Sequence, residues 1–184
     1  MISVLFRIGL YISSFFPLYI LLIVNNYKHF TSWKKIKDVF LFKDLLLSVF
    51  SYSLIVLIIS SLIYLIVIMK INLNEKNQFV EVCKTEDRLL NYVVTYLVPL
   101  LSIDLTKANS MLVNLGLFLL LGFIYVKNSL VYLNPLFLFF NYNVFITKDD
   151  DVIISNYDIY GLKSREGERL RTRKLSYKIY LVRK

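Results

Sequence analysis

The sequence predicts a mainly α-helical membrane protein with four transmembrane helices and a small C-terminal cytoplasmic β-rich domain. Hydrophobic residues make up 57% of the 184 positions, and the mean hydropathy is +0.60, which exceeds that of ordinary soluble domains. Several long segments carry no charge, whereas the end of the chain is polar and alternates as strands do. These observations divide the chain into a transmembrane domain, 1–142, and a β-rich tail, 143–184.

The clearest span is 45–69, which reads LLLSVFSYSLIVLIISSLIYLIVIM and contains no charged residue. As an α-helix at ~1.5 Å per residue it would be about 37 Å long, more than the ~30 Å hydrocarbon core of a bilayer. A helix buried in a soluble domain rarely needs apolar residues on every side over such a length. The segment is therefore predicted to cross a membrane.

The first span is expected at about residues 4–24, where an uncharged run follows Arg7. Pro17 lies in the middle of this run and predicts a kink, because proline cannot donate the helical hydrogen bond. A cleaved signal peptide is the alternative. No basic cluster precedes the run and no small-residue cleavage pattern follows it, which favours a retained span.

Two further spans are expected at about 89–105 and 108–127, joined so closely that they form a helical hairpin. The run 89–105 is short for a span and contains Pro99. It reaches across a bilayer if Arg88 and Asp104 lie at the two interfaces.

Two polar segments adjoin these spans. Residues 70–88 carry nearly balanced charges and are expected to be a solvated connector. Residues 128–142 are rich in Tyr, Phe and Asn and are interrupted by Asn134-Pro135, so we expect an interfacial segment. A fifth span over 128–147 is the alternative.

The tail, 143–184, is predicted to contain about four short strands. Val144–Ile146 and Val152–Ile154 flank Lys148 and three aspartates, the pattern of a hairpin with an acidic turn. Two more strands are expected within 169–175 and 176–183. Such strands are enough for a small sheet or barrel at the membrane surface.

Four spans would place both termini on one side of the membrane. In that arrangement sixteen of the 22 Lys and Arg residues lie on the side of the termini and six on the other. The positive-inside rule then puts both termini in the cytoplasm. With five spans the tail would lie on the opposite side from the N-terminus.

No catalytic, cofactor or metal site is expected, and the protein is predicted not to be an enzyme. The sequence lacks a Ser/His/Asp set, HExxH, a P-loop and GxGxxG. His29 and Cys83 are its single histidine and cysteine. The spans contain charges only at their ends, which argues against an ion-coupled transporter.

The basic tail is the remaining candidate for function. Its physical uses are contact with anionic lipid, with an acidic protein surface or with nucleic acid near the membrane. Anchoring of the topology by positive charge is the simpler alternative. The candidate partner-binding residues are Lys163, Arg165, Arg169, Arg171, Arg173, Lys174 and Lys178.

Several stretches of the second half resemble one family. They are NYVVTYLVPLLS at 91–102, GFIYV at 122–126, YLNP at 132–135 and NYNVF at 141–145, which leads into the strand-rich tail. Together they resemble KwaA, the membrane subunit of the Kiwa anti-phage defence system. The first two spans match this family in number, length and order.

The resemblance implies a four-span inner-membrane protein that assembles as a homo-oligomer, a tetramer. Such a protein would sense phage infection and hold a cytoplasmic DNA-binding partner, KwaB, so that it contacts DNA only through that partner. The tail, or else residues 70–88, would be the docking surface. The rival hypotheses are an oligomeric pore-forming or depolarising effector and a transporter subunit.

Overall fold

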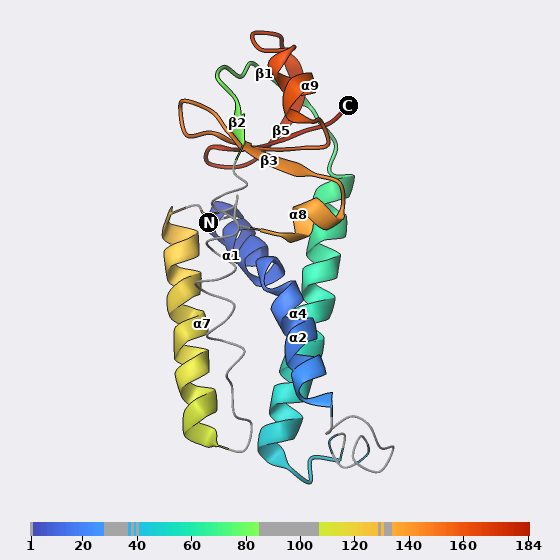
Figure 1. Ribbon diagram of the computed structural model, residues 1–184, viewed down its shortest axis with the longest axis vertical. Coiled ribbons are helices and arrows are strands. Elements are labelled where there is room, and N and C mark those ends of the chain that lie inside the picture. The colour runs from blue at the N-terminus through green and yellow to red at the C-terminus, as the bar shows by residue number, and fades with distance from the viewer. Residues whose placement is uncertain are drawn as a thin grey trace.

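A computed structural model describes residues 2–27, 37, 39, 41–84, 107–128, 130 and 134–184. Long helices extend from one face of a β-sheet, which closes one end of the molecule (Figure 1). Three described segments are long and apolar enough to cross a membrane: Val4–Asn25, Leu45–Lys70 and Ala108–Asn128. The expected span at 89–105 lies outside the described residues.

Helix α4, Leu45–Lys70, confirms that the clearest predicted span forms one helix long and apolar enough to cross a membrane. It begins at Asp44, whose carboxylate accepts a hydrogen bond from the backbone N–H of Leu47 at 3.1 Å and so satisfies one of the free donors of the first turn. It ends where the backbone becomes extended at Ile71. Apolar side chains remain exposed along its length, which suits lipid better than water.

Helix α7, Ala108–Asn128, confirms a helix of membrane-spanning length at the position predicted for the span 108–127. Among its residues, only Leu121 and Tyr125 are buried. The other apolar side chains of α7 are exposed or half-buried, so this helix also suits a lipid environment.

The first span consists of two helices, α1, Ile2–Ser14, and α2, Phe16–Asn25, which meet at Phe15. Pro17 lies in the first turn of α2, where its missing N–H costs no helical hydrogen bond. The predicted kink is confirmed. It falls before the proline because a proline ring disturbs the turn that precedes it.

Glycines let α1 approach both α4 and α7. The ring of Tyr64 from α4 covers Gly9, and its hydroxyl donates to the carbonyl of Phe6 at 2.5 Å. Likewise, the ring of Tyr11 from α1 covers Gly122 of α7, and its hydroxyl donates to the carbonyl of Phe118. Each contact combines close backbone approach with a hydrogen bond, two means by which membrane helices associate.

The sheet has six strands in the order β1-β5-β6-β4-β3-β2. Strands β3 and β4 form the predicted antiparallel hairpin, and the two strands expected near the C-terminus are present as β5 and β6. Neighbouring strands are antiparallel except β4 and β6, which are parallel. The strands are β1 Glu75–Asn77, β2 Cys83–Lys84, β3 Asn143–Ile146, β4 Val152–Ser155, β5 Leu170–Ser176 and β6 Ile179–Val182.

The two edge strands come from the segment that was expected to be a solvated connector. Strand β1 pairs with β5 and strand β2 pairs with β3. Between them, Phe79 and Val82 are buried against the sheet. The expectation of a solvated connector is therefore wrong for residues 75–84. Charged residues dominate the composition of this segment, so the sequence did not indicate that its few apolar residues are buried.

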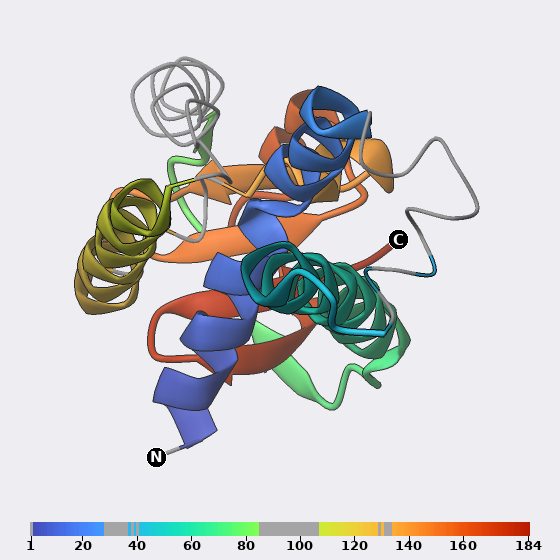
Figure 2. The same ribbon diagram turned by 90° about the horizontal axis from the view of Figure 1, so that it is seen from below.

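The two faces of the sheet pack against different partners. The inner face, with Ile154 and Leu181, belongs to the same hydrophobic cluster as the membrane helices. The outer face, with Ile153 and Val182, is covered by Leu162 of the short helix α9, Ile159–Lys163. Figure 2 views the molecule from the side of the helices, with the sheet behind them and α1 running obliquely across it.

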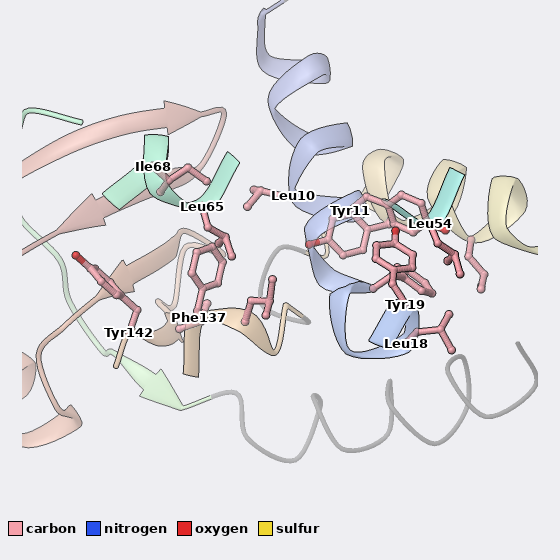
Figure 3. Close-up of a cluster of buried hydrophobic side chains, with 14 of the residues drawn as sticks. Leu10, Tyr11, Leu18, Tyr19, Leu54, Leu65, Ile68, Phe137 and Tyr142 are labelled. Carbon is pink, nitrogen blue, oxygen red and sulfur yellow. The ribbon is translucent and has the colours of Figure 1, made fainter. Parts of the chain in front are cut away.

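Helix α8, Leu136–Phe139, connects the helices to the sheet. Its Leu136 and Phe137 are buried in the cluster that also contains Leu10 of α1 and Leu65 of α4 (Figure 3). Residues 134–147 therefore form a short helix followed by β3 and no membrane-spanning helix. The interfacial position expected for 128–142 stays a prediction.

Candidate functional site

The seven candidate partner-binding residues do not form one surface. The cross-strand register assigns Arg171 and Arg173 to the inner face of the sheet and Lys174 to the outer face, while Lys178 lies in the turn between β5 and β6. The other three lie in or after α9. They are Lys163, Arg165 and Arg169.

The register of the strands assigns Arg173 to the inner face. Arg173 pairs with Leu181, which pairs in turn with Ile154, and both apolar side chains pack against the membrane helices. Side chains that lie directly across neighbouring strands share a face. Arg171, two residues earlier on β5, points the same way and is opposite Lys76 of β1.

Lys174 belongs to the outer face, because it pairs with Tyr180, whose ring contacts Phe79 at 5.5 Å between centroids. Lys163 and Arg169 are also exposed, in α9 and in the loop that leads to β5. Arg165 donates to the hydroxyl of Tyr157 at 3.1 Å and covers that ring, so its side chain also stabilises the loop. We call Lys163, Arg165, Arg169 and Lys174 the outer basic group.

Lys178 contributes to a turn and not to an open basic surface. Its ammonium donates to the backbone carbonyl of Asp149. Burial raises the pKa of the neighbouring Asp151 carboxyl, while the charge of Lys178 opposes that rise. Lys178 has positive φ, 59°, as residues in tight hairpin turns commonly do.

Two arginines that the sequence did not single out join the sheet to the ends of the membrane helices. Arg7 donates to the carbonyl of Val126 in the last turn of α7 at 3.2 Å and to the hydroxyl of Ser176 in β5 at 3.4 Å. Arg183, just after β6, donates to the carbonyl of Ile68 in the last turn of α4 at 3.1 Å. Positive charge at a helix C-terminus satisfies free carbonyls and complements the helix dipole.

A buried polar junction stabilises the break in the first span. The side-chain amide of Asn134 donates to the carbonyl of Leu10 at 3.3 Å and to the hydroxyl of Ser13 at 2.8 Å. Tyr19 donates to the carbonyl of Ile12 at 3.0 Å. These bonds supply additional donors to two carbonyls in the last turns of α1, just before the break. In the sequence, the pair Asn134-Pro135 indicated an interruption of the apolar run 128–142, but it did not predict this contact with α1.

The chemistry of these surfaces is non-covalent binding. Within the described ranges, no group of three or more His, Cys, Asp or Glu residues is placed to hold a metal ion. Cys83, in the edge strand β2, is exposed. What the geometry offers a partner is basic side chains on two opposite faces of a sheet that is fixed to membrane helices.

Comparison with curated proteins and with solved structures gave no match. A family model described as anti-phage protein KwaA matches residues 6–181. The match covers nearly the whole chain: it includes α2, α4, α7 and strands β1 to β5 in full, and all but the first residues of α1 and the last residue of β6. It confirms the resemblance seen in the second half of the sequence. The chain belongs to the KwaA family of anti-phage proteins.

Proposed function

We propose that this chain acts in anti-phage defence as a non-enzymatic membrane sensor and scaffold that recruits a cytoplasmic DNA-binding effector to the inner membrane. The match to the KwaA family over residues 6–181 carries the defence role. The scaffold mechanism is supported by the architecture, in which a compact sheet projects from one end of apolar helices. The effector is KwaB, as the family resemblance implies.

The proposal includes four membrane crossings. The C-terminal turn of α7 contacts Arg7, which also contacts the sheet. Since α7 has 21 residues, its start lies about 30 Å from the sheet at ~1.5 Å per residue. Lys84 in β2 and Lys107 therefore lie at opposite ends of the helices. The 22 residues between them, if helical, would cover about 33 Å, enough for a further span.

The sheet is proposed to lie in the cytoplasm. It and the helix ends next to it carry most of the Lys and Arg residues, including Lys70, Lys127 and the basic residues of β5. Positive charge next to membrane spans is retained on the cytoplasmic side. Both termini then face the cytoplasm, because α1 begins at the sheet end and the chain ends after β6.

The outer basic group is the proposed docking surface. Lys163 is exposed in α9, which covers the face of the sheet that points away from the helices, and Arg169 is exposed in the loop that joins α9 to β5. Tyr160, three residues before Lys163 in α9, is 80% exposed and adds an aromatic side chain of the kind enriched at interfaces. A cytoplasmic protein could reach this face without entering the lipid.

Assembly as a homotetramer is part of the proposal through the family resemblance. Helix α7 offers a surface for such contacts, because the position of Gly116 opens onto empty space and the apolar residues around it, including Leu112, Leu119 and Phe123, are exposed. Small residues allow close helix packing in a bilayer. Native mass spectrometry of the detergent-solubilised protein would contradict this part if it found only monomers.

The scaffold is tested by purifying the tagged chain from membranes of cells that express KwaB from the same system. The variant Lys163→Gln/Arg169→Gln/Lys174→Gln should lose most of the co-purified KwaB, because its docking charges are gone. The control Lys76→Gln/Arg171→Gln/Arg173→Gln removes equal charge from the inner face and should retain it. No KwaB with the wild type, or equal loss in both variants, would contradict the proposal.

A pore-forming or depolarising effector is the rival function, and the break at Phe15 is the feature that favours it. The hydroxyls of Ser13 and Ser14 bond to the carbonyls of Leu10 and Tyr11, so these groups are engaged within the protein. Proteoliposomes that contain the chain alone distinguish the functions. Dye leakage or loss of an imposed potential would favour the pore, whereas tight vesicles support the scaffold.

A further inference from the structure

We propose that the inner edge of the sheet binds the headgroups of anionic phospholipids through Lys70, Lys76, Arg171 and Arg173, which we call the inner basic group. This surface is separate from the outer basic group and faces the membrane instead of the cytoplasm. The proposal requires the helices to be inserted in a bilayer, but it does not depend on capture of KwaB.

The height of the inner basic group matches the headgroup layer. Helix α4 has 26 residues and is about 39 Å long, so a ~30 Å hydrocarbon core leaves its terminal turns among the headgroups. Lys70 is the last residue of α4, and β1 begins at Glu75 after only four residues. Strand β1 and its neighbour β5 are therefore held beside the end of the membrane helix.

The register aims the basic side chains of this edge at the membrane. Arg173 continues a row of apolar residues that pack on the helices, and Arg171 and Lys76 lie one step further along the same face. Asn74 accepts a hydrogen bond from Arg173 at 2.6 Å and orients it. Glu75, the acidic residue of β1, pairs with Thr172 and lies on the opposite face.

The positive charges of the inner basic group favour binding of an anion. Lys76 and Arg171 are directly opposite each other on neighbouring strands, where like charges destabilise a sheet. Within the described part of the chain, neither side chain has an acidic partner. A lysine on an edge strand also discourages pairing with another sheet, but that role does not explain two arginines on the strand beside it. A phosphate between them would offset the repulsion and accept several hydrogen bonds.

Anionic lipid is the occupant that fits this position. A soluble acidic protein would have to enter the narrow space between the sheet and the bilayer, where phospholipid headgroups already lie. Each basic residue near an anionic membrane surface contributes about a fivefold preference for anionic lipid. Removing three such residues should therefore reduce that preference by about a hundredfold at low salt.

The test uses the full chain in nanodiscs of phosphatidylcholine, with or without phosphatidylglycerol. Native mass spectrometry counts the lipids retained by the protein in an equimolar mixture. Wild type should retain phosphatidylglycerol preferentially, and this preference should fall sharply in Lys76→Gln/Arg171→Gln/Arg173→Gln. The matched outer variant, Lys163→Gln/Arg169→Gln/Lys174→Gln, should keep the wild-type preference. An unchanged preference in the inner variant, or an equal loss in both, would overturn the proposal.

A charge-preserving variant distinguishes loss of positive charge from misfolding as the cause of a lost lipid preference. Arg171→Lys/Arg173→Lys keeps the net charge and should keep most of the preference for phosphatidylglycerol. If it loses the preference as fully as the glutamine variant although its far-UV circular dichroism is unchanged, electrostatic recognition of headgroups is refuted. Failure of the scaffold would show instead as loss of KwaB from the wild type, with the lipid preference intact.

Discussion

Replacing Gly122 by alanine is expected to destabilise the contact between α1 and α7. The new Cβ would lie 2.8 Å from Cε1 of Tyr11 and within 3.3 Å of two further ring atoms, whereas carbon atoms at ordinary contact are about 3.5–4 Å apart. The ring would have to move by about 1 Å. Tyr11 is almost fully buried and is surrounded by Phe15, Phe118 and Tyr125, with ring centroids at 4.8, 5.0 and 5.3 Å.

The magnitude follows from two losses. Overpacking of a filled core costs about 1–3 kcal/mol, and weakening the bond from the Tyr11 hydroxyl to the carbonyl of Phe118 costs about 1 kcal/mol more. Gly116→Ala is the matched control for packing within one subunit, because it lies in the same helix and its Cβ would meet nothing in that subunit; both variants are compared as monomers, so that a contact of Gly116 with a second subunit does not contribute. The gain in helix propensity is common to both variants. Gly122→Ala should therefore be less stable than Gly116→Ala by about 2–4 kcal/mol.

Equilibrium unfolding in mixed micelles of dodecylmaltoside and sodium dodecyl sulfate measures this difference, with circular dichroism as the signal. Removing the ring by Tyr11→Ala should abolish most of the cost of Gly122→Ala in a double-mutant cycle. The packing argument fails if the two glycine variants differ by less than ~0.5 kcal/mol, or if the cost persists without the Tyr11 ring.

Three further predictions concern other contacts. Asn134→Ala should lower the free energy of unfolding by about 1–3 kcal/mol, because the buried Ser13 hydroxyl and Leu10 carbonyl each lose the hydrogen bond that they accept from the Asn134 amide; an unchanged midpoint in the same micelle titration would contradict it. Arg183→Met should speed amide hydrogen exchange in the last turn of α4, whereas the exposed control Lys184→Gln should not, and equal protection in both would refute a role for this bond. Burial raises the pKa of Asp151 above its ordinary 3.8, because the folded state favours the protonated carboxyl. The folded protein therefore has its full stability at a pH below 3.8 and loses this part of it as the pH rises through the folded-state pKa of Asp151. Asp151→Asn should therefore gain stability relative to wild type from acid to neutral pH, and thermal melts showing the opposite trend would be inconsistent with a raised pKa.

The spans of α4 and α7 and the strands of the tail were predictable because their signals are local. A run such as 45–69 needs only length and the absence of charge, and the hairpin of β3 and β4 needs only alternation and a polar turn. The kink in the first span followed from Pro17 for the same reason. Its position at Phe15 came from the contacts of the turn before the proline.

The edge strands and the split of the basic residues could not be predicted, since both depend on pairing between distant parts of the chain. Strand β1 is defined by its register with β5, almost one hundred positions later. A run of basic residues along β5 looks continuous in the sequence. In a strand, successive side chains point to opposite faces, so the register places Arg173 towards the membrane and Lys174 away from it.

The contacts of the arginines at the helix ends could not be predicted from the local sequence either. Arg7 appeared only as a charge that flanks the first span, and Arg183 only as one of many basic residues in the tail. Their partners are backbone carbonyls of α7 and α4, and no sequence pattern identifies a carbonyl as an acceptor. The defence role came from the family and not from any cluster of reactive side chains.

The side of the membrane on which the sheet lies decides whether it can hold a cytoplasmic effector. Cys83, the single cysteine of the sequence, is exposed on β2 and reports this directly. A membrane-impermeant maleimide should label it in inside-out inner-membrane vesicles and leave it unlabelled in intact spheroplasts. Labelling in intact spheroplasts, with protection in the inverted vesicles, would place the sheet outside the cytoplasm and contradict the scaffold.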